Sequence, residues 1–163
     1  MNKNLTTTNQ NAKLALNKSK SLLDITNKLL SKKDIDTLVQ SFNFTPFVRE
    51  NGHSISVESV AISPDGKTIV SGSYDNTIKI WDKQSGECLK TLKGHSDSVS
   101  SVAISPDGKT IVSGSYDNTI KIWDIQSGEC LNTLYGHSYS VESVAISPCG
   151  KTIVSGSSDG TIK

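Results

Sequence analysis

Short alternations of apolar and polar residues recur along the chain from residue 56 onward. The stretch Ser56–Ile62 alternates through most of its length, as a half-buried β-strand does. A turn motif follows it: Pro64 restricts φ, Asp65 can bond its own backbone, and Gly66 accepts a positive φ. The pattern therefore predicts a strand that ends in a tight turn at residues 63–66.

Three more strands are predicted after this turn. The β-branched runs Thr68–Ser71 and Thr77–Trp81 are separated by the short link Tyr74–Asn76, which is typical of a hairpin. A fourth strand, Cys88–Leu92, follows the turn at residues 85–86. Together these elements predict a four-stranded antiparallel sheet.

The same unit is repeated along the chain. Gly-His pairs begin at positions 52, 94 and 136, at a spacing of 42 residues. The repeats at about 53–94 and 95–136 are identical at 37 of 42 positions, and the shorter third, 137–163, matches the second at 22 of 27. Four short antiparallel strands in about 42 residues correspond to one blade of a β-propeller. An all-β fold is therefore predicted for residues 48–163.

Three motifs in each full repeat resemble the WD-repeat (WD40) family. They are the Gly-His pair, the sequence Ser-Pro-Asp-Gly, and the Trp-Asp pair at 81–82 and 123–124. The resemblance covers residues 52–163 and implies a partial WD-repeat propeller, an incomplete ring of four-stranded antiparallel blades. It also implies a protein-interaction role.

The residue types of a hydrolytic triad are present in His95, Ser113 and Asp117. The resemblance implies a different role for them, a buried structural network of His, Ser, Asp and Trp within each blade. Every repeat carries its own copy of the set, which favours the structural interpretation. Ser73 lies on the same strand face as Ser71 and is an alternative hydroxyl. The predicted network residues are His53, Ser71, Asp75, Trp81, His95, Ser113, Asp117, Trp123, His137, Ser155 and Asp159.

Positions that differ between repeats are candidates for partner binding. Some follow Gly-His-Ser and others precede the turn aspartate, so they belong to loops and hairpin ends. The resemblance implies that such positions surround the central channel on a face that binds peptides and protein segments. Neutral drift at tolerant surface sites is the alternative. The candidates are Ile55, Tyr74, Asp97, Tyr116 and Tyr139.

The three cysteines do not form a CxxC pair, and their odd number argues against a disulfide framework. Cys88 and Cys130 occupy equivalent positions in the fourth strand, where we expect small buried apolar side chains. Cys149 replaces the turn aspartate of the earlier repeats, which predicts a thiol near the surface. We expect no metal and no cofactor.

The first part of the chain, residues 1–47, differs in composition from the repeats. All 12 glycines lie at or after Gly52. A disordered start is predicted, followed by one or two short α-helices, because apolar residues at 22–30 and 35–42 have helical spacing and residues 31–34 have the form of a capping box. Phenylalanines at 42, 44 and 47 are candidates for an outer strand that pairs with a last blade, although Pro46 weakens it.

Charge narrows the classes of partner. Residues 1–50 carry 8 Lys and Arg against 4 Asp and Glu, and residues 51–163 carry 9 against 12. The net charge of −3 on the repeats disfavours nucleic acid, and no membrane association is expected. The sequence has neither a signal-peptide core nor an apolar run long enough to span a membrane, so a cytoplasmic location is predicted.

The predicted function is a non-catalytic protein–protein interaction scaffold. The alternative is a sensor or regulatory segment of a larger enzyme such as an NTPase, protease or kinase. The sequence holds no GxxxxGK[ST], HExxH or GxSxG motif, so this chain is not expected to be an enzyme.

The third repeat ends at Lys163, inside its predicted third strand. Three interpretations follow: a fragment of a larger propeller protein, a unit that self-associates through the unfinished third blade, or a truncated product.

Overall fold

The computed structural model describes residues 51–163. The predicted N-terminal helices, the predicted strand with phenylalanines 42, 44 and 47, and the boundary between residues 47 and 48 lie outside the described residues. They stay predictions.

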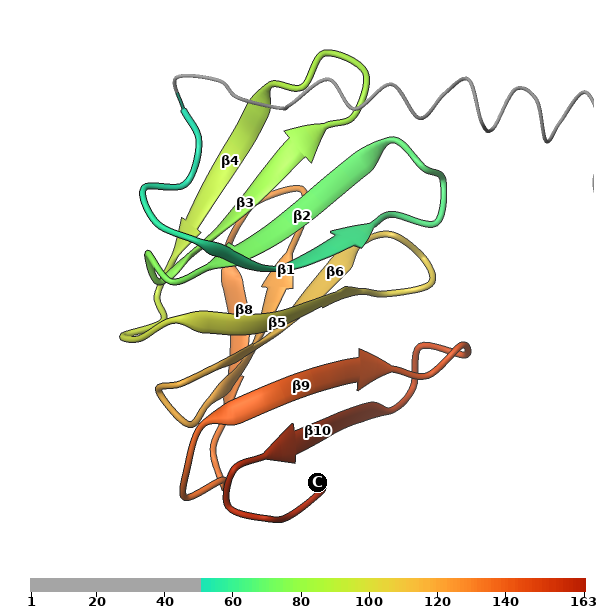
Figure 1. The fold of residues 1–163 in the computed structure, drawn as a ribbon. Coiled ribbons are helices and arrows are strands. Elements are labelled where there is room, and N and C mark those ends of the chain that lie inside the picture. Colours follow the sequence, from blue (N-terminus) through green and yellow to red (C-terminus); the bar gives the residue numbers. More distant parts are fainter. Residues whose placement is uncertain (1–50) are drawn as a thin grey trace, which may run out of the picture. The chain divides into compact units, whose positions relative to one another are not determined.

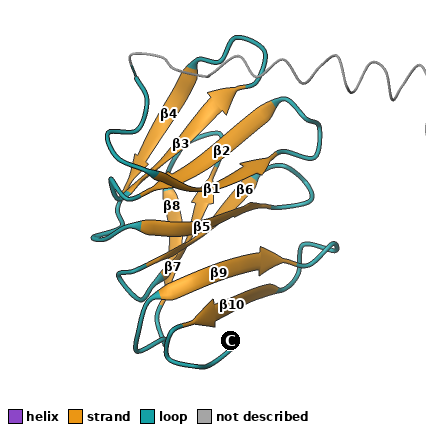
Figure 2. Ribbon diagram, viewed as in Figure 1, coloured by secondary structure: helices purple, strands orange, loops and turns teal. Residues whose placement is uncertain are grey.

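The described part of the chain consists of β-strands joined by short turns and loops (Figure 2). Their positions follow the apolar and β-branched runs of each repeat, since such side chains suit a pleated and half-buried surface. The strands are β1 (Val57–Ile62), β2 (Thr68–Ser73), β3 (Thr77–Asp82), β4 (Cys88–Lys93), β5 (Val99–Ile104), β6 (Thr110–Ser115), β7 (Ile120–Asp124), β8 (Cys130–Leu134), β9 (Val141–Ile146) and β10 (Ile153–Ser157).

The strands form three antiparallel sheets, one for each repeat (Figure 1). The first sheet has the order β1-β2-β3-β4 and the second has the order β5-β6-β7-β8, so the predicted four-stranded sheets are confirmed. The third sheet pairs β9 with β10. Residues 161–163 run beside β10, where the backbones of Ser155 and Lys163 exchange hydrogen bonds of 2.9 and 3.0 Å. The sheets are successive blades of a partial propeller.

The turn between β1 and β2 is held by its own side chains. The carboxylate of Asp65 accepts hydrogen bonds from the hydroxyl of Ser63 at 2.6 Å and from the amide of Lys67 at 3.0 Å. Gly66 has a φ of 69°, a left-handed conformation that glycine adopts without strain. The turn chemistry expected from the sequence is therefore present.

The turn between β2 and β3 also needs one residue with positive φ. Asn76 and Asn118 occupy that position in the first two repeats with φ of 65° and 68°, and Gly160 occupies it in the third with φ of 78°. Asparagine and glycine are the residues that best tolerate this conformation. The change from Asn to Gly in the third repeat therefore preserves the turn.

Close packing between neighbouring sheets depends on one glycine in the second strand of each full repeat. A Cβ atom added at Gly72 would lie 2.7 Å from Val99 Cγ1 and 3.1 Å from Val102 Cγ1. The equivalent Gly114 has Val141 at 2.7 Å and Val144 at 3.1 Å. The absence of a side chain at these glycines lets the valines of the next sheet approach the backbone.

The apolar core lies between the sheets and not within any one of them. Trp123 belongs to the second sheet but packs in a buried cluster with residues of the first. That cluster contains Val70, Ile78, Ile80, Leu92, Val99, Val102, Ile111 and Trp123. A second cluster, formed by the second and third sheets, contains Val112, Ile120, Val141 and Val144.

Candidate functional site

The four predicted network residues of the second repeat are joined by hydrogen bonds. His95 Nδ1 lies 2.7 Å from Asp117 Oδ2, and His95 Nε2 lies 2.8 Å from Ser113 Oγ. Trp123 Nε1 donates to the same Ser113 Oγ at 2.9 Å. The loop before β5, strand β6, the β6–β7 turn and strand β7 are thus linked through side chains.

The first repeat has the same arrangement. His53 Nδ1 is 2.9 Å from Asp75 Oδ2, His53 Nε2 is 2.7 Å from Ser71 Oγ, and Trp81 donates to Ser71 Oγ at 2.8 Å. Ser73, the alternative hydroxyl, instead donates to the backbone oxygen of Ser56 at 2.8 Å. The structure therefore selects Ser71 for this network.

In the third repeat the histidine, serine and aspartate are again connected. His137 Nδ1 lies 2.8 Å from Asp159 Oδ2, and His137 Nε2 lies 2.9 Å from Ser155 Oγ. No tryptophan of the described residues donates to Ser155. The structure thus brings all eleven predicted network residues together, in three separate sets.

Sequence reasoning missed one member of each set, a threonine two residues after the aspartate. Thr77, Thr119 and Thr161 donate to the turn carboxylates at 2.5, 2.6 and 2.6 Å. The same threonines donate backbone amides to these carboxylates at 2.9 to 3.0 Å. The Asp-x-Thr spacing, present in all three repeats, was the signal that could have identified them.

The bonding pattern defines the protonation states of the second set. Burial opposes ionisation of Asp117, but hydrogen bonds from Thr119 and His95 outweigh it and hold the pKa of Asp117 below its ordinary value. Burial of the imidazole lowers the pKa of His95, although Asp117 acts in the opposite direction. A neutral His95 therefore donates from Nδ1 to Asp117 and accepts at Nε2 from the hydroxyl of Ser113.

This geometry does not suit nucleophilic catalysis. Ser113 is 0% exposed, and its hydroxyl oxygen already accepts a hydrogen bond from Trp123. A catalytic serine needs an open approach for its substrate and an oxygen lone pair directed toward it. The arrangement can join strands to loops, and it presents no nucleophile to solvent.

Two of the candidate partner-binding residues contact each other across neighbouring sheets. The rings of Tyr74 and Tyr116 pack edge to face, with centroids 6.1 Å apart and an interplanar angle of 80°. A hydrogen bond with Tyr74, desolvation and the nearby carboxylates of Glu142 and Glu58 raise the pKa of Tyr116 to about 12. The aromatic pair therefore lies in an acidic environment.

The other candidates lie at the same end of the sheets. The hydroxyls of Ser115 and Ser157, at the ends of β6 and β10, donate to the backbone oxygens of Asp97 and Tyr139. Ser73 Oγ, at the end of β2, lies 3.4 Å from the backbone oxygen of Ile55. These contacts hold each loop against the turn that follows the strand. This is the end at which β1, β5 and β9 begin (Figure 1). The side chains of Ile55, Asp97 and Tyr139 are exposed. We call the five residues Ile55, Tyr74, Asp97, Tyr116 and Tyr139 the rim.

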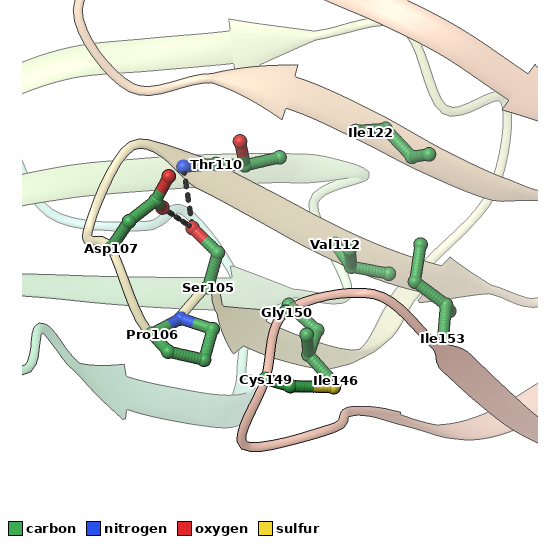
Figure 3. Close-up of a pocket in the computed structure, with 10 residues that line it drawn as sticks. All are labelled: Ser105, Pro106, Asp107, Thr110, Val112, Ile122, Ile146, Cys149, Gly150 and Ile153. Carbon is green, nitrogen blue, oxygen red and sulfur yellow. Dashed lines mark hydrogen bonds between the residues drawn. The ribbon is translucent and has the colours of Figure 1, made fainter.

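A hollow of about 550 Å³ opens between the second and third sheets at the opposite end (Figure 3). Apolar side chains including Val112, Ile122 and Ile153 line it, together with the turns that contain Asp107 and Cys149. Between the first two sheets the equivalent side chains pack around Trp123. The hollow thus corresponds to a position of sheet packing, and the polar groups of Ser105 and Asp107 in its lining are hydrogen-bonded to each other within their turn.

The cysteines differ in part from expectation. Cys88 is partly buried, but Cys130 is exposed, so its predicted burial is wrong. Both lie on the outermost strand of a sheet, where one side of the strand has no neighbouring strand to cover it. Cys149 is exposed, and its Sγ lies 3.3 Å from Ser147 Oγ in the turn.

Residues 51–163 contain no group of three or more His, Cys, Asp and Glu side chains arranged to hold a metal ion. In the same range no helix has the length and apolar character needed to cross a membrane.

Comparison with known proteins gives several matches of limited extent. Ribosome assembly protein 4 of Saccharomyces cerevisiae is 50% identical over 46 residues, 28% of this chain and 9% of that protein. Ribosome biogenesis protein bop1 of Danio rerio is 39% identical over 70 residues, 43% of this chain and 8% of that protein. The chain therefore spans less than a tenth of the length of these relatives.

A solved structure has a similar fold. The structure of U3-55K matches with a TM-score of 0.67 and 34% sequence identity, over 69% of this chain and 36% of that one. The model of the family described as "WD domain, G-beta repeat" matches residues 44–82, 86–124 and 128–163. These segments include the three sheets and their hydrogen-bonded sets. The chain therefore belongs to the WD-repeat family.

Proposed function

We propose that this chain is a non-catalytic protein–protein interaction segment and that the rim is its contact surface. The observation that carries the proposal is the edge-to-face pair of Tyr74 and Tyr116, which joins two blades at the end where the variable loop residues gather. Aromatic side chains with polar tips are frequent anchors at interfaces. The repeated backbone of the blades holds the rim residues at one end of the sheets. The side chains at these positions differ between repeats, so they determine which groups the rim can bind.

The charges near the rim favour one class of peptide. The carboxylates of Glu58 and Glu142 lie close enough to Tyr116 to raise its pKa, and Asp97 is exposed on the loop of the same repeat. A partner segment with lysine or arginine would complement these charges, whereas an acidic segment would be repelled. The proposed partner is therefore a protein segment with basic residues.

The names of the relatives concern ribosome assembly and biogenesis. The stretches shared with them are 46 and 70 residues long, which is one to two repeats of the blade itself. Ribosome-assembly factors are therefore among the partners to test.

The experiment compares binding by the wild-type chain with binding by two double variants. Partners captured by the wild-type chain are identified, and their affinities are then measured for Tyr74→Ala/Tyr116→Ala and for the control Lys83→Ala/Lys93→Ala. Both control lysines are exposed. We expect the tyrosine variant to bind at least about tenfold more weakly and the lysine variant to bind normally. Equal losses in both variants would contradict the rim assignment.

Two further measurements address the alternatives. Hydrolysis of generic ester or peptide substrates that disappears in Ser113→Ala would contradict the non-catalytic proposal and favour an enzyme segment. Salt-dependent retention on heparin would favour a nucleic-acid partner over a protein partner. Localisation in the cytoplasm stays a prediction, which imaging of the tagged chain would test.

A further inference from the structure

The chain uses one sheet-to-sheet contact twice. In each case two valines in the first strand of a sheet cover a glycine in the second strand of the preceding sheet. The contacting sets are Val99 and Val102 over Gly72, and Val141 and Val144 over Gly114. The repetition shows that this contact is a general property of the 42-residue unit.

A hydrogen bond accompanies both contacts. The backbone amide of Val102 donates to Ser59 Oγ at 3.1 Å, and the backbone amide of Val144 donates to Ser101 Oγ at 3.1 Å. Each bond joins the first strands of neighbouring sheets. The contact therefore has an apolar part and a polar part with a fixed register.

The valines of the first sheet have no such cover. Val57 and Val60 are equivalent to Val99 and Val102, yet they are 49% and 67% exposed, whereas Val99 and Val102 are 0% and 7% exposed. No described residue covers them as Gly72 and its neighbours cover the valines of β5. We call Val57 and Val60 the head.

The third sheet has the complementary surface. A Cβ atom added at Gly156 would meet nothing within 4 Å, in contrast to Gly72 and Gly114. Val154 is 43% exposed, whereas its equivalent Val112 is 1% exposed. Ser143, equivalent to Ser59 and Ser101, is also exposed. We call Ser143, Val154 and Gly156 the seat.

Head and seat match the two sides of a contact that the chain already makes. Strand β1 has the same sequence, VESVAI, as β9, which packs on the second sheet. Strand β10 has the sequence IVSGS, which also occurs in β2, the strand that receives the valines of β5. The head therefore has the residues that dock, and the seat has the residues that accept them.

We infer that a second copy of this chain binds here, head to tail. Val57 and Val60 of one copy cover Gly156 of the other, and the amide of Val60 donates to Ser143 Oγ. The two copies contribute different surfaces, so the contact is heterologous and extends into a closed ring or an open chain of copies. It lies on the faces of the end sheets and not on the rim, so it is independent of the proposed binding function.

The test uses the full 163-residue chain and two variants that each block one surface. Val60→Glu places a charge in the head, and Gly156→Glu fills the seat. The control Leu131→Glu introduces the same charge at an apolar position of β8 that is 58% exposed and belongs to neither surface. Light scattering after size exclusion gives the mass over a range of protein concentrations, and circular dichroism verifies the β-structure of each variant.

We expect the wild type and Leu131→Glu to exceed the monomer mass of 17.5 kDa as concentration rises. Each blocked variant alone should remain a monomer. An equimolar mixture of Val60→Glu and Gly156→Glu should form a dimer of one copy each, because the mixture retains one intact head and one intact seat.

Three results would overturn the inference. The first is a wild-type monomer at every concentration. The second is association that Leu131→Glu reduces as much as the blocked variants do. The third is a mixture of the two blocked variants that stays monomeric.

Discussion

Trp123 donates its indole N–H to the hydroxyl oxygen of Ser113, 2.9 Å away, and this bond completes a chain that continues through His95 to Asp117. Because the oxygen of Ser113 accepts from the indole, its hydrogen is directed to the imidazole. The serine is fully buried in this position. A set of residue types known from hydrolases thus serves to hold a loop and two strands together.

Removing the carboxylate of Asp117 should destabilise the fold. In Asp117→Ala the buried imidazole of His95 and the hydroxyl of Thr119 lose their acceptor, at a cost of about 1–3 kcal/mol in the free energy of unfolding. Denaturant unfolding followed by circular dichroism measures this change. Asp107→Ala is the matched control, because Asp107 accepts hydrogen bonds in an exposed turn. Equal destabilisation by both variants would contradict the larger contribution to stability that is expected of the buried network.

A methyl group at Gly114 should be far more costly than one at Gly156. The Cβ of Gly114→Ala would lie 2.7 Å from Val141 Cγ1, so the second and third sheets must separate or the valine must move. Overpacking of this kind costs about 1–3 kcal/mol. Gly156→Ala has open space around the new methyl group and should leave monomer stability nearly unchanged. Thermal unfolding of both variants at one low protein concentration compares them. A similar loss in both would mean that strand conformation, and not sheet contact, explains the glycines.

Stability should fall as the pH is lowered through the ordinary pKa of histidine, about 6.5, toward the lower folded-state pKa of His95. Burial lowers the pKa of His95 in the folded chain, so below about pH 6.5 the unfolded chain binds the proton more readily, and protonation favours unfolding. The contribution of His95 is complete above that pH and is lost as the pH falls through the folded-state pKa. A second loss should follow at more acidic pH, because the folded-state pKa of Asp117 is also lowered.

Denaturant unfolding at a series of pH values between 7.5 and 3 tests both steps. In His95→Gln the loss of stability below about pH 6.5 should be smaller than in the wild type. An unchanged pH dependence in this variant would assign the effect to other groups.

Tyr116 should titrate well above an ordinary tyrosine. A hydrogen bond with Tyr74, desolvation and nearby carboxylates raise its pKa to about 12. Ultraviolet absorbance of the phenolate should therefore show one late-titrating tyrosine in the wild type. In Tyr74→Phe, which keeps the ring but removes the hydroxyl, the pKa of Tyr116 should move toward 10. Tyr135→Phe serves as the control, since Tyr135 is 81% exposed and belongs to neither network nor rim.

Local pattern was sufficient to predict the blades. Alternation, turn residues and the 42-residue spacing identified the strands of the first two sheets, because strand and turn formation depend mainly on neighbours in sequence. The same spacing identified His95, Ser113 and Asp117 as members of a repeated set. Their role could be inferred because a site used once has no reason to occur in every repeat.

Contacts between the sheets were decided by the tertiary structure. Gly72 and Val99 belong to different repeats, and nothing in the local pattern shows that they meet. A Cβ atom added at Gly72 would lie 2.7 Å from Val99 Cγ1. The choice of Ser71 over Ser73 and the pairing of Tyr74 with Tyr116 have the same origin. Likewise, the exposure of Cys130 follows from its place on an outer strand. The sequence by itself therefore determined each blade, through short-range backbone and turn preferences, while the packing distance between blades decided which side chains meet and which stay exposed.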